Sequence, residues 1–466
     1  MKYRFLLILS LLLYFKVEAQ INTNNNTQSF QLEAVIPTQK GKKIYLGQYW
    51  NSGTYAIDST FISDEGIAKF SSPESKLEGQ YFLYIKPDYQ VDFLIGSEQN
   101  NIKFTLNEND IKANKVSGSK DTEVLWQYIQ MTYNADRLRE QIENSNISDK
   151  EKSAKEKELN KAQKDIDSYK KALFKQNTDL WGALYIKGLE PTGIPYPEPK
   201  TQEEASENRK YGKLHYFDNI NLTDPRFWRT NYFENYIDTY LQQWVEASPD
   251  SLASAASLLV KKTIDNDICF ERMLSKLINE SIKSLKMGDK NIWSRLYEDY
   301  IMGKNISWID STQYLKLGQM YEKIKNNRIG MYAHNLRVQT ISGDSINTNG
   351  IDSKYTILYF YSPSCGYCVT EVPKMYNELY SKYKDKGLEI IAFNVGSSKE
   401  DWIKFINDNK LTGWINCADL NYKSQYWMHY DVSGTPSVLV LDKDKRIIAK
   451  KLDLENLQKL FNYLYQ

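Results

Sequence analysis

The stretch SPSCGYCVTEVP, residues 362–373, holds two of the four cysteines of this 466-residue chain, three positions apart. The apolar run 355–361 precedes it and predicts a buried strand, and a helical pattern follows over 366–386. A Cys-x-x-Cys pair at a strand-to-helix turn places Cys365 at the helix N-terminus, where free N–H groups and the helix dipole favour the thiolate. Cys368 lies one turn further and can attack a mixed disulfide formed by Cys365. The pair therefore predicts a redox couple.

Three other uses of the pair stay open at this point. A small structural disulfide is one, although closing so short a loop removes little chain entropy. A peroxiredoxin site is another, but Leu358 and Ser362 occupy its proline and hydroxyl positions relative to Cys365. A zinc site needs two further ligands, and the chain has no second paired spacing. The remaining cysteines and histidines are Cys269, Cys417, His215, His334 and His429. We expect no metal.

The first residues predict an exported protein. Lys2 and Arg4 are followed by the apolar run 5–15 and by the small-residue site 17–19, the pattern of a cleaved secretory signal peptide over residues 1–19. The apolar run is about half of the ~20 residues that span a bilayer, so an uncleaved anchor is the weaker alternative and no stable membrane span is expected. An exported chain with so few cysteines must derive its stability from packed cores.

The overall charge excludes some partners. The 60 basic and 59 acidic residues nearly cancel, so no global field attracts nucleic acid or an anionic membrane surface. The length indicates about three domains.

Residues 20–117 are expected to form an all-β sandwich-like domain or a small barrel. Short runs with a period of two residues recur over 29–107, separated by Gly, Pro and Asp-Glu-Gly turns. No catalytic constellation is found among them. Tyr45, Tyr49 and Trp50 are interpreted as core side chains, with a lectin-like binding face as the alternative.

Residues 118–328 change to the period of helices and predict a helical domain. The segment 232–245 places its aromatic side chains on one stripe, and Ser248 with Pro249 opens a further helix. A heptad seam over 159–173 is too short to predict an intermolecular coiled coil, so an intradomain helical hairpin is favoured. The four prolines of 190–199 predict an extended loop.

Residues 329–466 alternate apolar runs with helical stretches, which predicts a layered α/β domain. The expected strands are 355–361, 388–395, 414–417, 436–441 and 447–450. The expected helices are 366–386, 399–410, 422–430 and 454–465.

This last domain resembles the thioredoxin superfamily, and in particular its exported TlpA/ResA-like branch. Glu371 and Pro373 match the C-x-x-C-x-x-E-x-P pattern of that branch, and Thr435-Pro436 matches the cis-proline that packs against the redox pair. The lead-in IGMYAHNLRV is also similar. Tyr359 departs from the pattern, because thioredoxin itself has a buried aspartate there. The segments FWRTNYFENYIDTYL and SPDS resemble uncharacterised modules of exported proteins from Gram-negative bacteria, which implies a periplasmic location.

The resemblance implies a thiol-disulfide oxidoreductase that acts on protein dithiols or disulfides. Cys365 would be the nucleophile, Cys368 the resolving thiol and Glu371 an acid/base neighbour. Substrate contacts would come from Gly366, Tyr367, Thr435 and Pro436. No cofactor is implied, and the partners would be protein substrates and an upstream thiol-disulfide electron donor or acceptor. The rival prediction is a non-catalytic envelope binding or scaffold protein with a thioredoxin-like domain.

Overall fold

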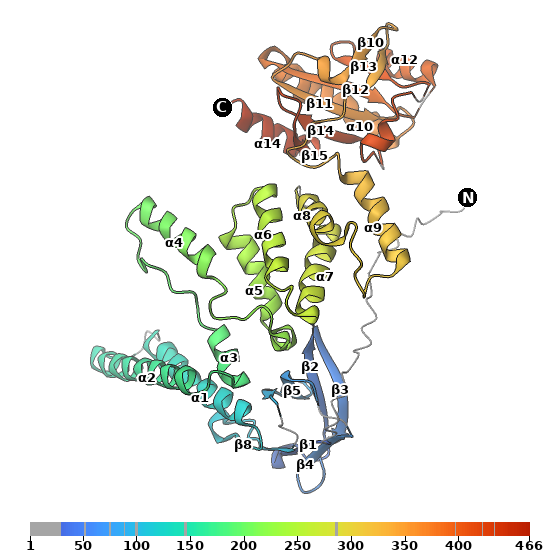
Figure 1. The fold of residues 1–466 in the computed structure, drawn as a ribbon. Helices are drawn as coiled ribbons and strands as arrows, with labels where there is room; N and C mark the ends of the chain where they lie inside the picture. The colour runs from blue at the N-terminus through green and yellow to red at the C-terminus, as the bar shows by residue number, and fades with distance from the viewer. Residues whose placement is uncertain are drawn as a thin grey trace. The chain divides into compact units, whose positions relative to one another are not determined.

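The structure of the protein is a computed structural model that describes most of the chain beyond the predicted signal segment, residues 1–19, which lies outside the described residues. It describes residues 29–50, 53–73, 76–87, 89–97, 101–143, 147–284, 288–396, 398–421, 423–432 and 434–466. By their contacts, these residues form two compact units (Figure 1). The described part of the first unit is 29–245 with 260–273, and the second unit is 246–259 with 274–466.

The first unit begins with two four-stranded sheets, in the orders β4-β1-β7-β8 and β3-β2-β5-β6. The strands are β1 Phe30–Val35, β2 Lys43–Trp50, β3 Gly53–Phe61, β4 Ile67–Ser72, β5 Gly79–Ile85, β6 Tyr89–Ile95, β7 Asn101–Thr105 and β8 Lys115–Ser117. Short 3-10 turns lie at η1 Pro37–Gln39 and η2 Ile111–Ala113. The rings of Phe93 in β6 and Phe104 in β7 pack at 5.0 Å between their centroids, which joins the two sheets through a shared core. The predicted sandwich-like region is confirmed.

Sequence patterning missed β3 because most of its side chains are exposed and do not alternate. The aromatic residues at the end of β2 are engaged within the unit. Tyr49 is buried and its hydroxyl donates to Asp92 at 3.0 Å. The guanidinium of Arg272 lies 4.2 Å from the ring centroid of Trp50. These contacts support the interpretation of Tyr49 and Trp50 as structural side chains.

The helices of the first unit include an antiparallel pair. They are α1 Lys120–Glu143, α2 Asp149–Gln176, α3 Trp181–Gly188, α4 Gln202–His215 and α5 Phe233–Thr239, with a 3-10 turn η3 Pro225–Arg229 and a π turn η4 Tyr240–Trp244. Lys155 of α2 bonds Gln141 of α1 at 2.7 Å, whereas the later Tyr169 bonds the carbonyl of the earlier Val124 at 3.1 Å. This crossed order shows an antiparallel hairpin, as the short heptad seam predicted. The segment 190–199 contains no helix or strand, as its prolines predicted.

The later helices lead to the C-terminal domain. They are α6 Pro249–Lys261, α7 Asp267–Lys283, α8 Asp289–Leu296 with the π turn η5 Tyr297–Ile301, and α9 Ser311–Ile324. The Ser248 hydroxyl accepts from the Ser251 N–H at 3.2 Å, which confirms the predicted cap at the start of α6. No helix among the described residues combines the length and the apolar character needed to cross a bilayer.

The C-terminal domain is built on a seven-stranded sheet in the order β10-β9-β13-β12-β11-β14-β15 (Figure 1). Its strands are β9 Arg337–Thr340, β10 Ser345–Asn347, β11 Tyr355–Tyr361, β12 Leu388–Asn394, β13 Ile415–Ala418, β14 Ser437–Leu441 and β15 Ile447–Lys450. Its helices are α10 Gly366–Lys374, α11 Ser381–Tyr383, α12 Lys399–Asp408, α13 Tyr426–His429 and α14 Leu454–Leu464, with the turns η6 Thr348–Gly350, η7 Met375–Tyr380 and η8 Lys384–Lys386. Strands β11, β12 and β13 are parallel, and β14 is antiparallel to β11.

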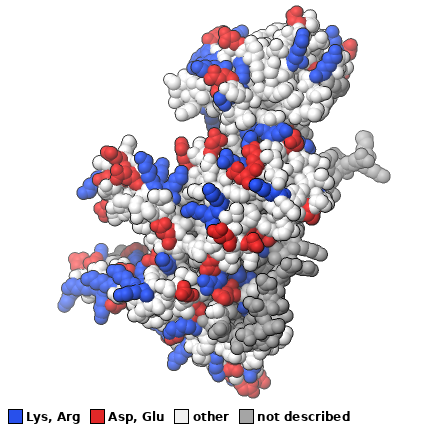
Figure 2. All heavy atoms as spheres, viewed as in Figure 1, with Lys and Arg blue, Asp and Glu red and all other residues white. Residues whose placement is uncertain are grey.

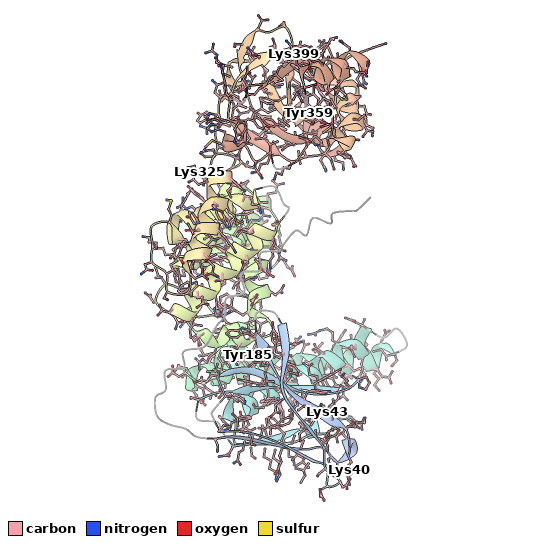
Figure 3. The ribbon with its side chains drawn as sticks, turned by 90° about the vertical axis from the view of Figure 1, so that its right-hand side faces the viewer. Lys40, Lys43, Tyr185, Lys325, Tyr359 and Lys399 are labelled. Atoms are coloured by element: carbon pink, nitrogen blue, oxygen red, sulfur yellow. The ribbon has the colours of Figure 1, made fainter. Side chains whose placement is uncertain are left out.

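Strand β11 separates the two cores of this domain. Ile357, Tyr359 and Tyr361 belong to the core cluster that contains Cys368, and the alternate residues Leu358 and Phe360 belong to the cluster on the other face of the sheet. This alternation follows from the two-residue period of a strand. It directs Tyr359 toward the side of the sheet that α10 covers. Figure 3 places Tyr359 within this domain.

All five predicted strands of the domain are present, but three elements differ from the prediction. The edge strands β9 and β10 were not predicted because they have only four and three residues and are largely exposed. The predicted helix 422–430 is reduced to α13, because the Asp419 carboxylate accepts from the N–H groups of Lys423 and Ser424 and holds these residues in a turn.

Acidic and basic side chains are interspersed over the face of the molecule shown in Figure 2. This distribution agrees with the near-zero net charge of the sequence.

Candidate functional site

The turn between β11 and α10 is fixed by serine hydrogen bonds. The Cys365 N–H donates to the Ser362 carbonyl at 3.0 Å, and the Ser364 N–H donates to the Ser362 hydroxyl at 3.3 Å. Cys365 is the N-cap residue of α10, with φ −84° and ψ 116°. An extended N-cap leaves the first helical N–H groups free to interact with the side chain that precedes them. The sequence prediction that Cys365 stands at the helix N-terminus is confirmed.

The thiol of Cys365 is partly exposed, and its pKa is lowered to about 7. A side-chain hydrogen bond with Thr435 is the largest cause, partial burial opposes it, and hydrogen bonds from Cys368 and from the backbone of Cys368 and Tyr367 add to the lowering. At neutral pH a substantial fraction of Cys365 is therefore thiolate, the form that attacks disulfides.

Cys368 has the opposite environment. Its side chain is fully buried, and burial raises its pKa to about 11, with the neighbouring Cys365 also raising it. The two thiols of one pair thus differ in both exposure and acidity. An exposed acidic thiol can open a disulfide, while a buried thiol of high pKa stays protonated until it is needed.

The loop before β14 completes the site from a distant part of the chain. The Thr435–Pro436 peptide bond is cis, as the resemblance implied. The Sγ atom of Cys365 donates to the Thr435 carbonyl oxygen at 3.2 Å in the protonated form. This contact brings the loop against the start of α10.

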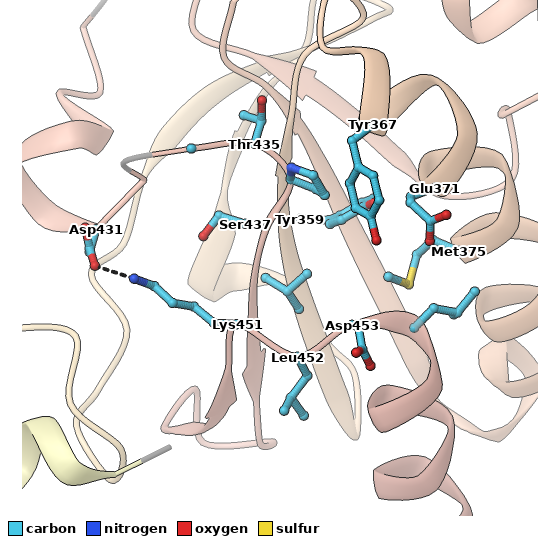
Figure 4. Close-up of a pocket in the computed structure, with 14 residues that line it drawn as sticks. Tyr359, Tyr367, Glu371, Met375, Asp431, Thr435, Ser437, Lys451, Leu452 and Asp453 are labelled. Carbon is cyan, nitrogen blue, oxygen red and sulfur yellow. Dashed lines mark hydrogen bonds and ion pairs between the residues drawn. The ribbon is translucent and has the colours of Figure 1, made fainter. Parts of the chain in front are cut away.

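A pocket of about 460 Å³ opens between α10 and this loop (Figure 4). Its lining residues are Tyr359, Tyr367, Glu371, Met375, Asp431, Gly434, Thr435, Pro436, Ser437, Val438, Lys451, Leu452, Asp453 and Leu454. Tyr367 is 60% exposed and forms part of the rim, as Figure 4 shows. The pocket is a concave surface beside a reactive thiol, where a substrate side chain could bind.

Glu371 lies in this pocket and is mostly buried. Its carboxylate forms an ion pair with Lys374 at 2.9 Å, on the same helix. Gly366, the other residue between the cysteines, has no neighbour where a Cβ atom would project, so this position faces open space. The structure therefore brings all seven predicted site residues into one region, with Gly366 at its outer edge.

Part of the pocket wall was not predicted from the sequence. Asp431 and Lys451 form an ion pair at 2.7 Å across it, and Asp453 caps α14 through the Asn456 N–H at 2.9 Å (Figure 4). Asp431 lies in the loop before β14, whereas Lys451 and Asp453 lie in the loop between β15 and α14, and no spacing in the sequence signals that these two loops converge. Tyr359 was noted only as a departure from thioredoxin, and the structure places its ring in the pocket.

The other two cysteines do not line the pocket and lack the acidic thiol of Cys365. Cys269 and Cys417 are both fully buried, and burial raises the pKa of each thiol, that of Cys269 to about 12. Cys417 lies within β13 and belongs to the core cluster on the face of the sheet opposite Cys368.

Comparison with known proteins gives two family matches and a group of curated relatives. Residues 352–447 match the family described as Thioredoxin-like, and residues 30–125 match a domain of unknown function, DUF4369. Thiol-disulfide oxidoreductase ResA of Geobacillus kaustophilus is 30% identical over 134 residues, which are 28% of this chain and 75% of the relative. The protein of the same name from Bacillus cereus is 29% identical over 29% of this chain and 77% of its own length.

Solved structures of similar proteins are also known. A domain of a "possible thiol-disulfide isomerase" from Cytophaga hutchinsonii is 36% identical and covers 29% of this chain and 92% of its own, with a TM-score of 0.28. A thioredoxin-like protein from Bacteroides caccae is 19% identical and covers 59% of this chain and 98% of its own, with a TM-score of 0.42. The match to three quarters of the Geobacillus relative decides the assignment: through its C-terminal domain, this chain belongs to the ResA-like thiol-disulfide oxidoreductases of the thioredoxin superfamily.

Proposed function

We propose that the protein exchanges disulfides with protein substrates through Cys365 and Cys368. The observation that carries this proposal is the contrast between the two thiols: Cys365 is partly exposed with a lowered pKa, and Cys368 is buried with a raised one. That contrast suits an attacking and a resolving thiol, respectively.

In the reducing direction, the Cys365 thiolate attacks a substrate disulfide, forms a mixed disulfide and releases one substrate thiolate. Cys368 then loses its proton and attacks the Cys365 sulfur, which releases the second substrate thiolate. The substrate gains two electrons, and the Cys365–Cys368 dithiol becomes a disulfide. An upstream thiol-disulfide partner restores the dithiol, and the same steps in reverse would oxidise a substrate.

The pocket beside α10 is the proposed substrate surface. Tyr367 stands on its rim and Pro436 forms part of its wall, with Thr435 in direct contact with Cys365. Gly366 leaves open space beside the reactive sulfur. A substrate chain can therefore approach Cys365 without displacing protein backbone.

The location and the role of the front regions complete the proposal. Residues 1–19 are proposed to be a signal peptide that is removed on export to the periplasm, which would leave domains 20–117 and 118–328 in front of the redox domain 329–466. None of the described residues of the front domains lines the pocket, so these domains are proposed to recruit the substrate and not to take part in the chemistry.

Trapping of mixed disulfides tests the proposed roles. Cys368→Ala should accumulate mixed disulfides on Cys365, because the resolving thiol is gone, whereas Cys365→Ala should form none. Non-reducing electrophoresis of the full chain with a disulfide-bonded protein would read out the adducts. Equal trapping by both variants would contradict the assignment, and no trapping by either would favour the non-catalytic scaffold.

A further inference from the structure

Tyr359 carries a buried hydroxyl that no described residue satisfies. The residue is 1% exposed, and its Oη atom has no hydrogen-bond partner among the described residues. Leaving such a group without a partner costs free energy. The next tyrosine on the same face of β11, Tyr361, differs in this respect, because its oxygen accepts from the Trp402 Nε1 at 3.1 Å. The burial of the Tyr359 hydroxyl without a partner among the described residues therefore calls for a functional explanation.

The residues around Tyr359 indicate which group its hydroxyl can donate a hydrogen bond to. Tyr359 and Cys368 belong to the same core cluster, and Tyr359 also lines the pocket (Figure 4). Burial is the largest cause of the raised pKa of its hydroxyl, and Cys368, Glu371, Tyr367 and the N-cap Cys365, all in or next to α10, raise it further. The other charged groups of the pocket wall are the Asp431–Lys451 ion pair and Asp453. Lys374 is paired with Glu371.

The resolving step requires a thiolate at Cys368, and a hydrogen bond from the Tyr359 hydroxyl could stabilise it. Cys368 must become a thiolate before it attacks, yet its sulfur is fully buried, and this burial outweighs the hydrogen bonds from the Ser362 backbone and the Thr435 side chain. A buried anion is stabilised by a hydrogen bond from a nearby donor. The Tyr359 hydroxyl does not bond Cys368 in this structure, so the bond would form together with the thiolate. Burial holds the pKa of Tyr359 far above its ordinary value, so the hydroxyl keeps its proton and is available as a hydrogen-bond donor.

We propose that the Tyr359 hydroxyl donates a hydrogen bond to the Cys368 sulfur as its thiolate forms, and so speeds the attack on the mixed disulfide. The inference rests on the proposed function. The proton that Cys368 loses goes to solvent through the pocket or to Glu371, and Tyr359 itself gains and loses none. The Cys365–Cys368 bond forms as the bond between Cys365 and the substrate breaks, so the substrate sulfur leaves with the electron pair.

The test follows both steps in the full chain with one reagent, an aromatic disulfide that releases coloured thionitrobenzoate. Attack by Cys365 releases one equivalent, and resolution by Cys368 releases the second. We expect Tyr359→Phe to leave the first release unchanged and to slow the second about tenfold at neutral pH, with its midpoint shifted upward by about one pH unit. The control Tyr361→Phe removes a buried hydroxyl from the same strand and should leave the second release within about twofold of the parent rate.

A second comparison separates Cys368 from Glu371 as the acceptor. If the hydroxyl serves Cys368, Tyr359→Phe slows the second release by the same factor in a Glu371→Gln background. Loss of the effect in that background would overturn the inference, as would an unaltered second release in Tyr359→Phe or an equal slowing by Tyr361→Phe. Absence of any release from the parent would refute the proposed function as well, whereas a normal first release with an unaltered second one refutes only the role of Tyr359.

The melting temperatures of the variants provide a separate test. Since the Tyr359 hydroxyl has no partner to lose among the described residues, Tyr359→Phe should melt at or above the parent temperature. Tyr361→Phe should melt below it, because Trp402 loses its acceptor. A lower melting temperature for Tyr359→Phe would show that the hydroxyl has a structural partner and would overturn the inference.

Discussion

The Sγ atom of Cys365 lies 3.2 Å from the carbonyl oxygen of Thr435, a residue 70 positions later in the chain. This contact joins the start of α10 to the cis-proline loop and sets the thiol at the edge of the pocket. It suits the protonated sulfur, which donates to the carbonyl. When Cys365 ionises, the hydrogen bond to the carbonyl is lost, and the thiolate is stabilised mainly by the side chain of Thr435, to which the N–H groups of Cys368 and Tyr367 at the helix N-terminus add.

The two thiols should be separable by alkylation. In the reduced full chain, the rate of modification of Cys365 by iodoacetamide should rise with pH to a midpoint near 7, because only the thiolate reacts. Cys368 should stay unmodified until far higher pH, since burial raises its pKa to about 11. Quenching samples across the pH range and mapping the peptides by mass spectrometry would measure both profiles. Modification of the two cysteines with one common midpoint would contradict the assignment.

Glu371 should influence the resolving step through its charge. Its carboxylate lies in the pocket one turn after Cys368, and the Lys374 ion pair offsets part of the charge. We expect Glu371→Gln to move the pH midpoint of the second thionitrobenzoate release downward by at most about one unit, because a like charge is removed. The plateau rate should also fall, because a proton acceptor is lost.

Glu378→Gln is the matched control for this experiment. Glu378 lies on the same helical segment but outside the pocket, where it accepts from Gln458 at 3.2 Å. Its substitution should leave the pH profile unchanged. Superimposable profiles for Glu371→Gln and the parent would remove Glu371 from the mechanism.

The redox domain should fold by itself. Every residue of its two core clusters lies within 329–466. Asn327, just before this segment, donates to the His429 carbonyl at 2.7 Å and accepts from Lys450 at 2.6 Å. We expect fragments 326–466 and 329–466 both to unfold cooperatively in urea, with the longer one more stable by about 1–3 kcal/mol from these hydrogen bonds. Failure of the longer fragment to fold would show that the preceding helices are part of the domain.

Acid should destabilise the fold through a histidine pair. The rings of His334 and His429 stack at 3.4 Å, and burial together with the charge of His334 lowers the pKa of His429. The unfolded chain therefore binds a proton at His429 first as the pH falls. Stability should decrease with falling pH from about 6.5 until the folded-state pKa is passed.

His429→Gln should flatten this part of the stability curve, measured by urea denaturation between pH 7 and 5. His215→Gln is the control, because His215 pairs with Asp218 at 2.7 Å and its removal should not relieve the acid sensitivity. An unchanged slope in His429→Gln would contradict the role of the pair.

The sequence predicted the structural elements that depend on local residue patterns. The strand Tyr355–Tyr361 coincides with a run that is apolar except for Thr356, and Cys365 caps the helix that follows it. The short edge strand Ser345–Asn347 was missed because it buries too little to leave an alternating pattern. The Asp431–Lys451 pair and the isolation of the Tyr359 hydroxyl depend on contacts between distant segments, which no spacing encodes.

An equilibrium redox titration of the full chain tests most directly whether Cys365 and Cys368 form a redox couple. Samples equilibrated in mixtures of reduced and oxidised glutathione would be trapped with acid, alkylated and mapped by mass spectrometry. We expect one two-electron transition, in which Cys365 and Cys368 convert together from a dithiol to an intramolecular disulfide while Cys269 and Cys417 stay reduced. A pair that remains disulfide-bonded in every mixture, or that never forms the disulfide, would contradict it.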